Sequence, residues 1–201
     1  MGRKSMADQR RSEIIDAFYR CVAREGFSGA SIRKVAQEAN VKPSILHHYF
    51  QNRDEMIETL VAHYTDMIFE YFNKKMRPYK DPEERLAHAL RFLFGPGMIG
   101  DEVTGVFLEF MVEARHNPRV RKTLATTFRR FRAAIIDFID DIETFKVLPG
   151  GTKNAYASMI IAMHEGMEIQ WFANPRDVSL KKAADIARMF IEMLATQKGG
   201  K

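Results

Sequence analysis

The sequence predicts an all-α protein of about nine helices, with a three-helix N-terminal head and a larger helical C-terminal body. Two observations lead to this fold class. Apolar residues recur at spacings of three and four along almost the whole chain, as they do on the buried face of a helix. No segment shows the strict alternation of apolar and polar residues that marks a strand.

The composition is that of a protein that folds around an apolar core in water. The chain has 201 residues, of which 46% are hydrophobic and 28% charged. No apolar run reaches the length of a membrane span, and no charged and then apolar signal sequence opens the chain. Cys21 is the single cysteine, and its place in an apolar helical stripe favours a buried, inert thiol. We therefore expect a cytoplasmic protein without a membrane partner.

The positive charge is concentrated at one end of the chain. Residues 1–53 contain ten Lys/Arg and five Asp/Glu, whereas residues 54–201 contain 21 of each sign. This asymmetry predicts a head, residues 1–53, that binds a polyanion, and a neutral body, residues 54–201. The alternative interpretation is a basic tail that only aids solubility.

Local signals mark the three helices of the head. The first helix is expected to end at Gly26, because glycine readily closes helices. Ser31 is a good N-cap for the short helix "IRKVAQEA", since its hydroxyl can accept an amide hydrogen of the first turn. Asn40 is expected in a left-handed conformation, and Pro43 suits the first turn of the third helix.

The body is expected to begin with a long helix and to continue with five more. The long helix starts near Asn52 and places Asp54 and Glu55 in its first turn, where the helix dipole favours acids. The expected helices cover about 52–77, 81 to the break at "GPGMIGD", 102–116, 118 to the stop at "LPGG", 154–172 and 180–195.

The third helix of the head has two chemically different faces. Leu46 and Phe50 point to a small core, and helical spacing places Ser44, His47 and His48 together on the opposite face. Two short helices joined by a tight turn and braced by a third form a helix-turn-helix. The polar face is therefore predicted to read base edges and phosphates. Alternatively, the two histidines are ordinary solvated side chains; a zinc pair is disfavoured, because adjacent helical residues diverge.

The stretch "GASIRKVAQEANVKPSILHHYFQNRDEM" resembles the DNA-binding signature of the TetR family of bacterial one-component repressors. That pattern is roughly Thr-x-x-x-Ile-Ala-x-x-Ala-Gly-Val-Ser-x-x-x-Leu-Tyr-x-His-Phe-x-x-Lys. It is matched by Ser31, Val35, Ala36, Ala39, Val41, Leu46, Phe50 and Arg53. The remaining chain is similar to the family in layout. The resemblance implies a homodimeric repressor that a small molecule releases from a near-palindromic operator on double-stranded DNA.

The resemblance also implies which residues of the head contact DNA. They are Ser31, Arg33, Lys42, Pro43, Ser44, Ile45, His47, His48, Tyr49 and Arg53. Ser31 and Arg53 would hold phosphates, and Ile45 would approach base edges. Four residues depart from the family pattern, so the operator sequence cannot be carried over: Asn40, Lys42, His47 and Tyr49 replace glycine, serine, tyrosine and histidine. Arg3, Lys4, Arg10 and Arg11 either reach adjacent phosphates or form a basic tail.

Two further sets of residues are expected in the body. The candidate ligand pocket comprises Tyr64, Met67, Phe92, Met98, Phe107, Phe110, Met111, Phe128, His164 and Trp171. Ordinary core packing is the alternative for each. The candidate dimer interface comprises Met159, Met163, Gly166, Met167, Ala187, Phe190, Ile191 and Leu194, on two helices that would pair with those of a second copy. The layout after residue 80 is similar to the choline-responsive branch of the family.

Other function classes are less well supported by the residues. An all-helical enzyme or metal-binding protein would use His88, His116 and His164, but no metal-binding or catalytic spacing joins them. An architectural DNA binder without a sensor would need no cavity in the body. We therefore expect a regulator and not an enzyme, with no cofactor and no metal. The sequence does not identify the effector.

Overall fold

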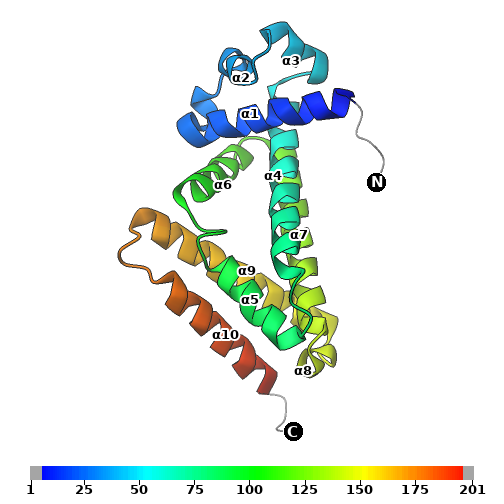
Figure 1. Cartoon of the computed structure of the whole chain (residues 1–201), viewed down its shortest axis with the longest axis vertical. Coiled ribbons are helices and arrows are strands. Elements are labelled where there is room, and N and C mark those ends of the chain that lie inside the picture. Colours follow the sequence, from blue (N-terminus) through cyan, green and yellow to red (C-terminus); the bar gives the residue numbers. More distant parts are fainter. Residues whose placement is uncertain (1–5, 197–201) are drawn as a thin grey trace. The chain divides into compact units, whose positions relative to one another are not determined.

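The computed structural model describes residues 6–196, and the side chains of 6–143 and 145–193 among them. These residues form helices and no strand, which confirms the all-α class (Figure 1). The helices are α1 (Met6–Gly29), α2 (Ile32–Glu38), α3 (Pro43–Tyr49), α4 (Arg53–Met76), α5 (Pro82–Leu93), α6 (Asp101–Ala114), α7 (Pro118–Asp140), α8 (Glu143–Lys146), α9 (Gly150–Ala173) and α10 (Leu180–Thr196). No helix in this described part is long and apolar enough to cross a membrane.

The chain packs as two compact units. Unit 1 comprises the chain up to Ile68 together with Gly105–Thr127, and unit 2 comprises Phe69–Thr104 and the chain from Phe128 onward. Helices α4, α6 and α7 each contribute residues to both units. The sequence suggested a functional boundary at residue 53, between the head and the body. This boundary stays a prediction. As a packing unit, the head also includes parts of α4, α6 and α7.

Unit 1 is built around the apolar face of α1. Helix α2 packs against both α1 and α3, and all three are seen together in Figure 1. Leu46 and Phe50 are almost fully buried, as the periodicity predicted. Cys21 is also buried, and this burial raises the pKa of its thiol. The expectation of an inert structural cysteine is therefore supported.

The local signals in the head act as the sequence predicted. The helical geometry of α1 breaks at Gly26, which has a φ of 67°. Ser31 caps α2 by accepting a hydrogen bond from the amide of Lys34 at 3.3 Å. Asn40 has a φ of 53°, and α3 begins at Pro43. These residues fix the tight turn that orients α3.

Unit 2 has its own apolar core, to which α5, the end of α7, α8, α9 and α10 contribute. Helix α10 packs against α5, α8 and α9. The buried residues of this core are Leu86, Leu90, Phe94, Ile139, Ile142, Phe145, Leu148, Ile160, Ala183, Ala184, Ala187 and Ile191.

Two boundaries differ from the sequence prediction. The helix expected to run from residue 118 to "LPGG" ends at Asp140, and the separate helix α8 follows it. Ile142, Phe145 and Leu148 continue the apolar spacing through this break, which conceals it in the sequence. Helix α9 begins at Gly150, earlier than expected, directly after its N-cap Pro149.

Candidate functional site

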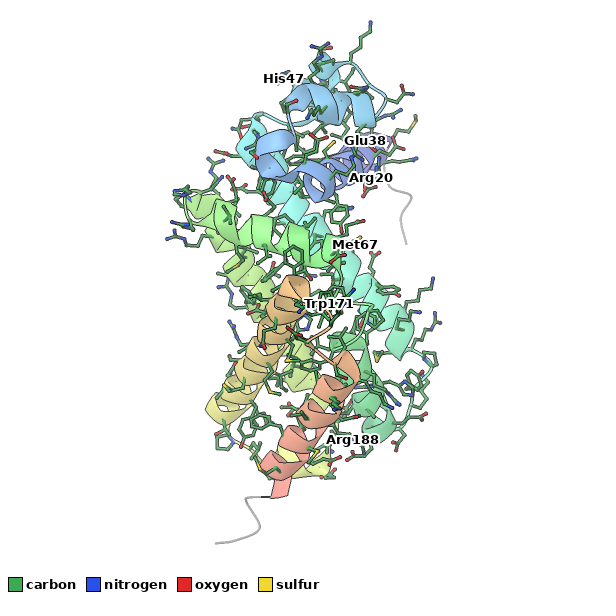
Figure 2. The ribbon with its side chains drawn as sticks, turned by 90° about the vertical axis from the view of Figure 1, so that its left-hand side faces the viewer. Arg20, Glu38, His47, Met67, Trp171 and Arg188 are labelled. Carbon is green, nitrogen blue, oxygen red and sulfur yellow. The ribbon has the colours of Figure 1, made fainter. Side chains whose placement is uncertain are left out.

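Helix α3 presents a continuous exposed polar face. Ser44, His47 and His48 are all exposed, and Leu46 alone of the α3 side chains is buried. Ile45 is 37% exposed, so an apolar methyl group is also available on this face. Figure 2 shows His47 projecting outward from α3. The arrangement can offer donors and acceptors to a partner while its back is anchored in the core.

The flanking predicted contacts are also accessible. Arg33, Lys42 and Pro43 are exposed. The side chains of Arg33 and Lys42 make no hydrogen bond or ion pair with any residue of the described chain. Ser31 is exposed although its hydroxyl already caps α2. Tyr49 is half-buried, and the His48 ring meets it edge-on with ring centroids 5.2 Å apart.

Arg53 has a structural role that the sequence did not reveal. Its Nη2 donates a hydrogen bond to the carbonyl oxygen of Phe27, and the guanidinium lies 5.9 Å from the centre of the Phe27 ring. The amide of Phe27 donates in turn to Oε2 of Glu109 in α6 at 2.7 Å. Glu109 is therefore connected to Arg53 through one residue. No local pattern in the sequence indicates Glu109, because its partner is far away along the chain.

The basic residues that precede the bundle differ in what they contact. Arg11 Nη1 donates to the carbonyl oxygen of Tyr49 at 2.5 Å, and Nη2 pairs with Glu55 at 2.8 Å. Arg10 pairs with Glu13 at 2.7 Å. Arg11 thus joins α1 to the junction of α3 and α4, which favours an internal role over a phosphate contact. Arg3 and Lys4 lie outside the described residues.

An ion-pair network fixes α2 against α1. Glu38 pairs with Arg20 and Arg24, each at 2.7 Å, and Figure 2 shows Arg20 and Glu38 on adjacent elements. The hydrogen bonds from Arg20 and Arg24 lower the pKa of Glu38. Lys34 and Glu25 form a further pair between the same helices. These contacts hold the two helices that precede α3 in a defined orientation.

The ten predicted pocket residues are divided between the two units. In unit 1, Tyr64 and Phe110 are buried and meet edge-on with ring centroids 5.3 Å apart, Phe107 is half-buried, and Met67 and Met111 are each 42% exposed. In unit 2, Met98 and His164 are buried, whereas Phe92, Phe128 and Trp171 are half-buried. Figure 2 labels Met67 on α4 and Trp171 on α9. Whether these residues bind a ligand stays a prediction.

Unit 2 contains a buried polar cluster, formed by Thr104, His164, Glu165 and Glu168. Thr104 is 0%, Glu168 3% and His164 8% exposed. Thr104 interacts with Glu168, and His164 with the backbone of Leu93, but within the described chain neither the Thr104 hydroxyl nor His164 Nδ1 makes a hydrogen bond of good geometry. His164 Nε2 lies 3.6 Å from Glu168 Oε2, and the Phe94 ring meets His164 edge-on at 6.0 Å. Buried polar groups without good hydrogen bonds are unusual and point to a binding function.

Burial shifts the protonation of this cluster. It lowers the pKa of His164 to about 4, so the imidazole is neutral at pH 7. Burial raises the pKa of Glu168 to about 7 although a hydrogen bond with Thr104 opposes the shift, and the neighbouring Glu165 carboxylate adds a smaller contribution. Burial also raises the pKa of Glu165. The cluster therefore carries acids with no cation to balance them, and a cationic ligand would favour their ionised form.

The predicted dimer residues fall into three groups. Met159 is 50% exposed, and Met163, Gly166, Met167 and Phe190 are half-buried. Ala187 and Ile191 face the core of their own unit and are only 2% exposed. The Leu194 side chain lies outside the described residues. On α10 the exposed apolar residues are instead Ile186, Met189 and Met193.

Comparison with known proteins gives two family matches. Residues 14–60 match the family described as bacterial regulatory proteins, tetR family. Residues 82–196, more than half of the chain, match the BetI-type transcriptional repressor C-terminal family. The HTH-type transcriptional regulators BetI of Burkholderia cenocepacia (strain HI2424) and Paraburkholderia phymatum are relatives at 25% and 26% identity. The alignments cover 96% and 98% of this chain, respectively, and 98% of each relative.

Solved structures share the fold. A putative transcriptional regulator from Pseudomonas aeruginosa PAO1 has a TM-score of 0.81 at 17% identity, covering 96% of this chain and 94% of its own. A putative regulator from Saccharomonospora viridis, solved in complex with choline, has a TM-score of 0.75 at 22% identity, covering 92% and 96%. With its N-terminal and C-terminal regions both matched, the chain belongs to the TetR family of bacterial transcriptional regulators, carries a BetI-type C-terminal region, and is a DNA-binding regulator and not an enzyme.

Proposed function

We propose that the protein is a homodimeric repressor that a small organic cation releases from a near-palindromic operator. The observation that carries the DNA-binding part is the two-faced α3, with Leu46 buried and Ser44, His47 and His48 exposed. A recognition helix needs this division between an anchoring face and a hydrogen-bonding face. As a bacterial DNA-binding regulator, the protein would act in the cytoplasm, where the chromosome lies.

The proposed DNA contacts divide by chemistry. Arg33 and Ser44 would bind base edges, and Ile45 would contact a thymine methyl group. Ser31 and Arg53 would hold phosphates at the starts of α2 and α4, and the remaining contacts of the set would be made by Lys42, Pro43, His47, His48 and Tyr49. The accessibility of Arg33 and Lys42, whose side chains have no polar partner in the described chain, supports this assignment.

The proposed dimer uses the outward faces of α9 and α10. On α9 the exposed or half-buried residues Ala155, Met159, Ala162, Gly166 and Ile169 recur at spacings of four and three. This is the repeat of a helix that packs along another helix. Nothing lies within 4 Å of the position that a Gly166 side chain would occupy, which leaves room for a close partner. Ile186, Met189 and Met193 add an apolar stripe from α10.

The proposed effector site is the buried polar cluster of unit 2. Glu168 is 3% exposed, and its one ion-pair neighbour in the described residues, His164, is neutral at pH 7, so a cation would supply the missing charge. The choline bound by the Saccharomonospora viridis regulator makes choline the first candidate to test. The Thr104 hydroxyl and His164 Nδ1, which lack hydrogen bonds of good geometry within the described chain, would orient a polar substituent such as a hydroxyl.

Release would follow from a preference of the effector for a conformation that binds DNA poorly. Because α4, α6 and α7 are continuous helices with residues in both units, a shift of their unit 2 portions is transmitted covalently to unit 1. The contact between Glu109 of α6 and Phe27 gives such a shift a route to Arg53.

Selection of binding sites from random DNA at fixed salt tests the DNA-binding and dimer proposals together. A two-fold symmetric motif is the expected result, and choline added to the selected site should lower the affinity. Sequence-independent, salt-sensitive binding would contradict the operator proposal and would favour an architectural DNA binder. An operator affinity unchanged by choline at concentrations at which it demonstrably binds would contradict the release mechanism alone.

A further inference from the structure

A concave groove in unit 2 lies apart from the buried polar cluster. It has a volume of about 650 Å³ and is formed by the end of α4, the connector to α5, the start of α5 and the second half of α7. Cavities that hold small organic ligands commonly have volumes of roughly 300–1,000 Å³. None of the residues that line it belongs to the DNA-contacting, pocket or dimer sets proposed above.

Aromatic rings form an apolar surface within the groove. Phe72 and Phe138 both line it, and their ring centroids are 5.3 Å apart. The Arg85 guanidinium lies over the Phe138 ring at 4.4 Å. Tyr79 is stacked on His88 at 3.6 Å, which fixes the orientation of its ring. A flat apolar ligand would find several ring faces and edges already held in place.

The charged residues of the groove are mostly cations. Lys74, Arg77 and Lys80 line it, are exposed, and have no carboxylate within ion-pair distance in the described part of the chain. Arg85 is already neutralised by an ion pair with Asp141, and Asp137 is the one acid among the lining residues. Three unbalanced cations against one carboxylate give the groove a net positive charge.

Some cations elsewhere in unit 2 are paired with acids. Lys146 pairs with Glu143, Lys153 with Asp140 and Arg188 with Glu192, at distances of 2.5–2.7 Å. Lys74, Arg77 and Lys80 instead lie along one lining without such partners, so their charges add. An anion that enters the groove would be attracted by three cations and would lose little hydration, since the rim is exposed.

We propose that this groove is a second ligand site, which binds a small organic anion with a flat apolar body, such as an aromatic carboxylate. The carboxylate contacts Arg77 and Lys80, and the ring packs on Phe72 and Phe138. The two sites of unit 2 thus select ligands of opposite charge. This proposal does not depend on DNA binding or on choline, because its evidence comes from other residues.

Calorimetric titration of the full chain with 2-naphthoate tests the site. The expected result is saturable binding of one naphthoate per chain. The double variant Arg77→Gln/Lys80→Gln should bind about tenfold more weakly, since two partly exposed charge contacts are lost. The matched control Lys75→Gln/Arg91→Gln removes two exposed cations of α4 and α5 that do not line the groove, and should bind as the original protein does.

Two further ligands separate the chemistry of the site. Neutral 2-naphthylmethanol should bind at least about tenfold more weakly than naphthoate, because it lacks the charge. Inorganic phosphate should displace naphthoate poorly, because it lacks the ring. Absence of saturable naphthoate binding, equal affinity in the double variant, or equal binding of the alcohol would overturn the proposal, as would phosphate competing as well as naphthoate itself.

Methionine methyl spectra locate the binding. Met76 lines the groove and is 6% exposed, whereas Met56 belongs to the core of unit 1. With methyl-labelled methionine, naphthoate should shift the Met76 resonance, assigned by the variant Met76→Leu, and leave the Met56 resonance in place. A shift at Met56 without one at Met76 would place the anion elsewhere and would contradict the proposed site.

Discussion

Glu109 Oε2 accepts a hydrogen bond at 2.7 Å from the backbone amide of Phe27, a residue 82 positions earlier in the chain. The carbonyl group of the same Phe27 accepts a hydrogen bond from Arg53. One peptide segment at the end of α1 therefore connects α6 to the first residue of α4. Since Arg53 is a proposed phosphate ligand, this connection is open to direct test.

Replacing Glu109 tests the connection. Glu109→Ala should lower the free energy of unfolding by about 1–3 kcal/mol, because a charge-assisted hydrogen bond is lost and the Phe27 amide is left unpaired. It should also weaken operator binding, since the Phe27 carbonyl that anchors Arg53 becomes mobile. Urea unfolding and operator titration measure the two effects. Glu109→Gln keeps an acceptor oxygen and should lose less of both; identical losses in the two variants would contradict the role of the acceptor.

Gly26 should be intolerant of any side chain. Gly26 has φ 67° and ψ 177°, a region that is essentially restricted to glycine and strains any other residue by about 1–3 kcal/mol. A Cβ atom there would also lie 2.8 Å from Glu109 Oε1. Gly26→Ala is therefore expected to lower the unfolding midpoint in urea. The control Gly105→Ala, in α6 with nothing within 4 Å, should be neutral or stabilising. Glu109→Ala removes the carboxylate that would clash, so Gly26→Ala should lower the unfolding midpoint less in that background. An equal loss in both backgrounds would contradict the steric explanation.

Removal of a base contact should alter sequence discrimination. Arg33→Ala and Ser44→Ala should each reduce the difference in binding free energy between operator and random DNA by about 1–3 kcal/mol. Both residues are exposed, so the variants should remain as stable as the original protein. Titrations of the two DNAs at several salt concentrations separate this effect from general electrostatic loss. Lys181→Ala, an exposed residue of α10, serves as the control. An equal loss of affinity for both DNAs in the Arg33 and Ser44 variants would reassign these residues to phosphate contacts.

The buried polar cluster should make stability depend on pH in two opposing ways. The folded pKa of Glu168, about 7, lies above its ordinary 4.5, so its contribution to stability falls as the pH rises between these values. The folded pKa of His164, about 4, lies below its ordinary 6.5, so its contribution falls as the pH drops through that range. Each effect can reach about 3 kcal/mol.

Single variants should expose each half of this balance. Glu168→Gln should be more stable than the original protein at pH 8, and its stability should fall as the pH drops from 6.5 to 4. His164→Gln should instead lose stability as the pH rises from 4.5 to 7. Urea unfolding over a pH series measures both slopes, and Glu143→Gln, an exposed acid, is the control. Parallel pH curves for all four proteins would show that the cluster does not titrate as described.

Choline binding should release a proton. A cation beside Glu168 favours the carboxylate and so lowers its pKa from about 7. Calorimetric titration at pH 7 in two buffers of different ionisation enthalpy measures the proton released. Glu168→Gln should abolish the release and weaken binding by about tenfold or more, as expected when one partner of a buried charge pair is removed. Neutral 3,3-dimethylbutanol has a similar shape, and equal affinity for it would contradict an electrostatic site.

The sequence allowed the head to be predicted in detail because its signals are local. Gly26, Ser31, Asn40 and Pro43 each act within one helical turn, and the structure confirms the conformation or cap expected at each. Similarly, Leu46 is buried as its spacing required. The DNA contacts proposed on the opposite face follow from these placements.

Long-range relationships could not be read in the same way. Glu109 meets Phe27, and Arg11 meets Glu55 and Tyr49, only because the fold brings distant segments together. Helix α8 was missed because its apolar spacing continues that of α7. The sequence pattern identified His164 as a candidate but did not indicate that Glu168 lies beside it. Glu168 becomes a candidate only because the fold buries its carboxylate, and burial cannot be read from one residue's local pattern.

Helix α10 uses two faces for two purposes. Ala187 and Ile191 are packed in the core of their own unit, whereas Ile186, Met189 and Met193 are exposed. Folding and the proposed pairing therefore depend on different residues of one helix. Substitutions on the outer face can change which chains associate without disturbing the protomer. A duplicated gene could diverge into a regulator that no longer mixes subunits with its parent through a few changes at these three positions.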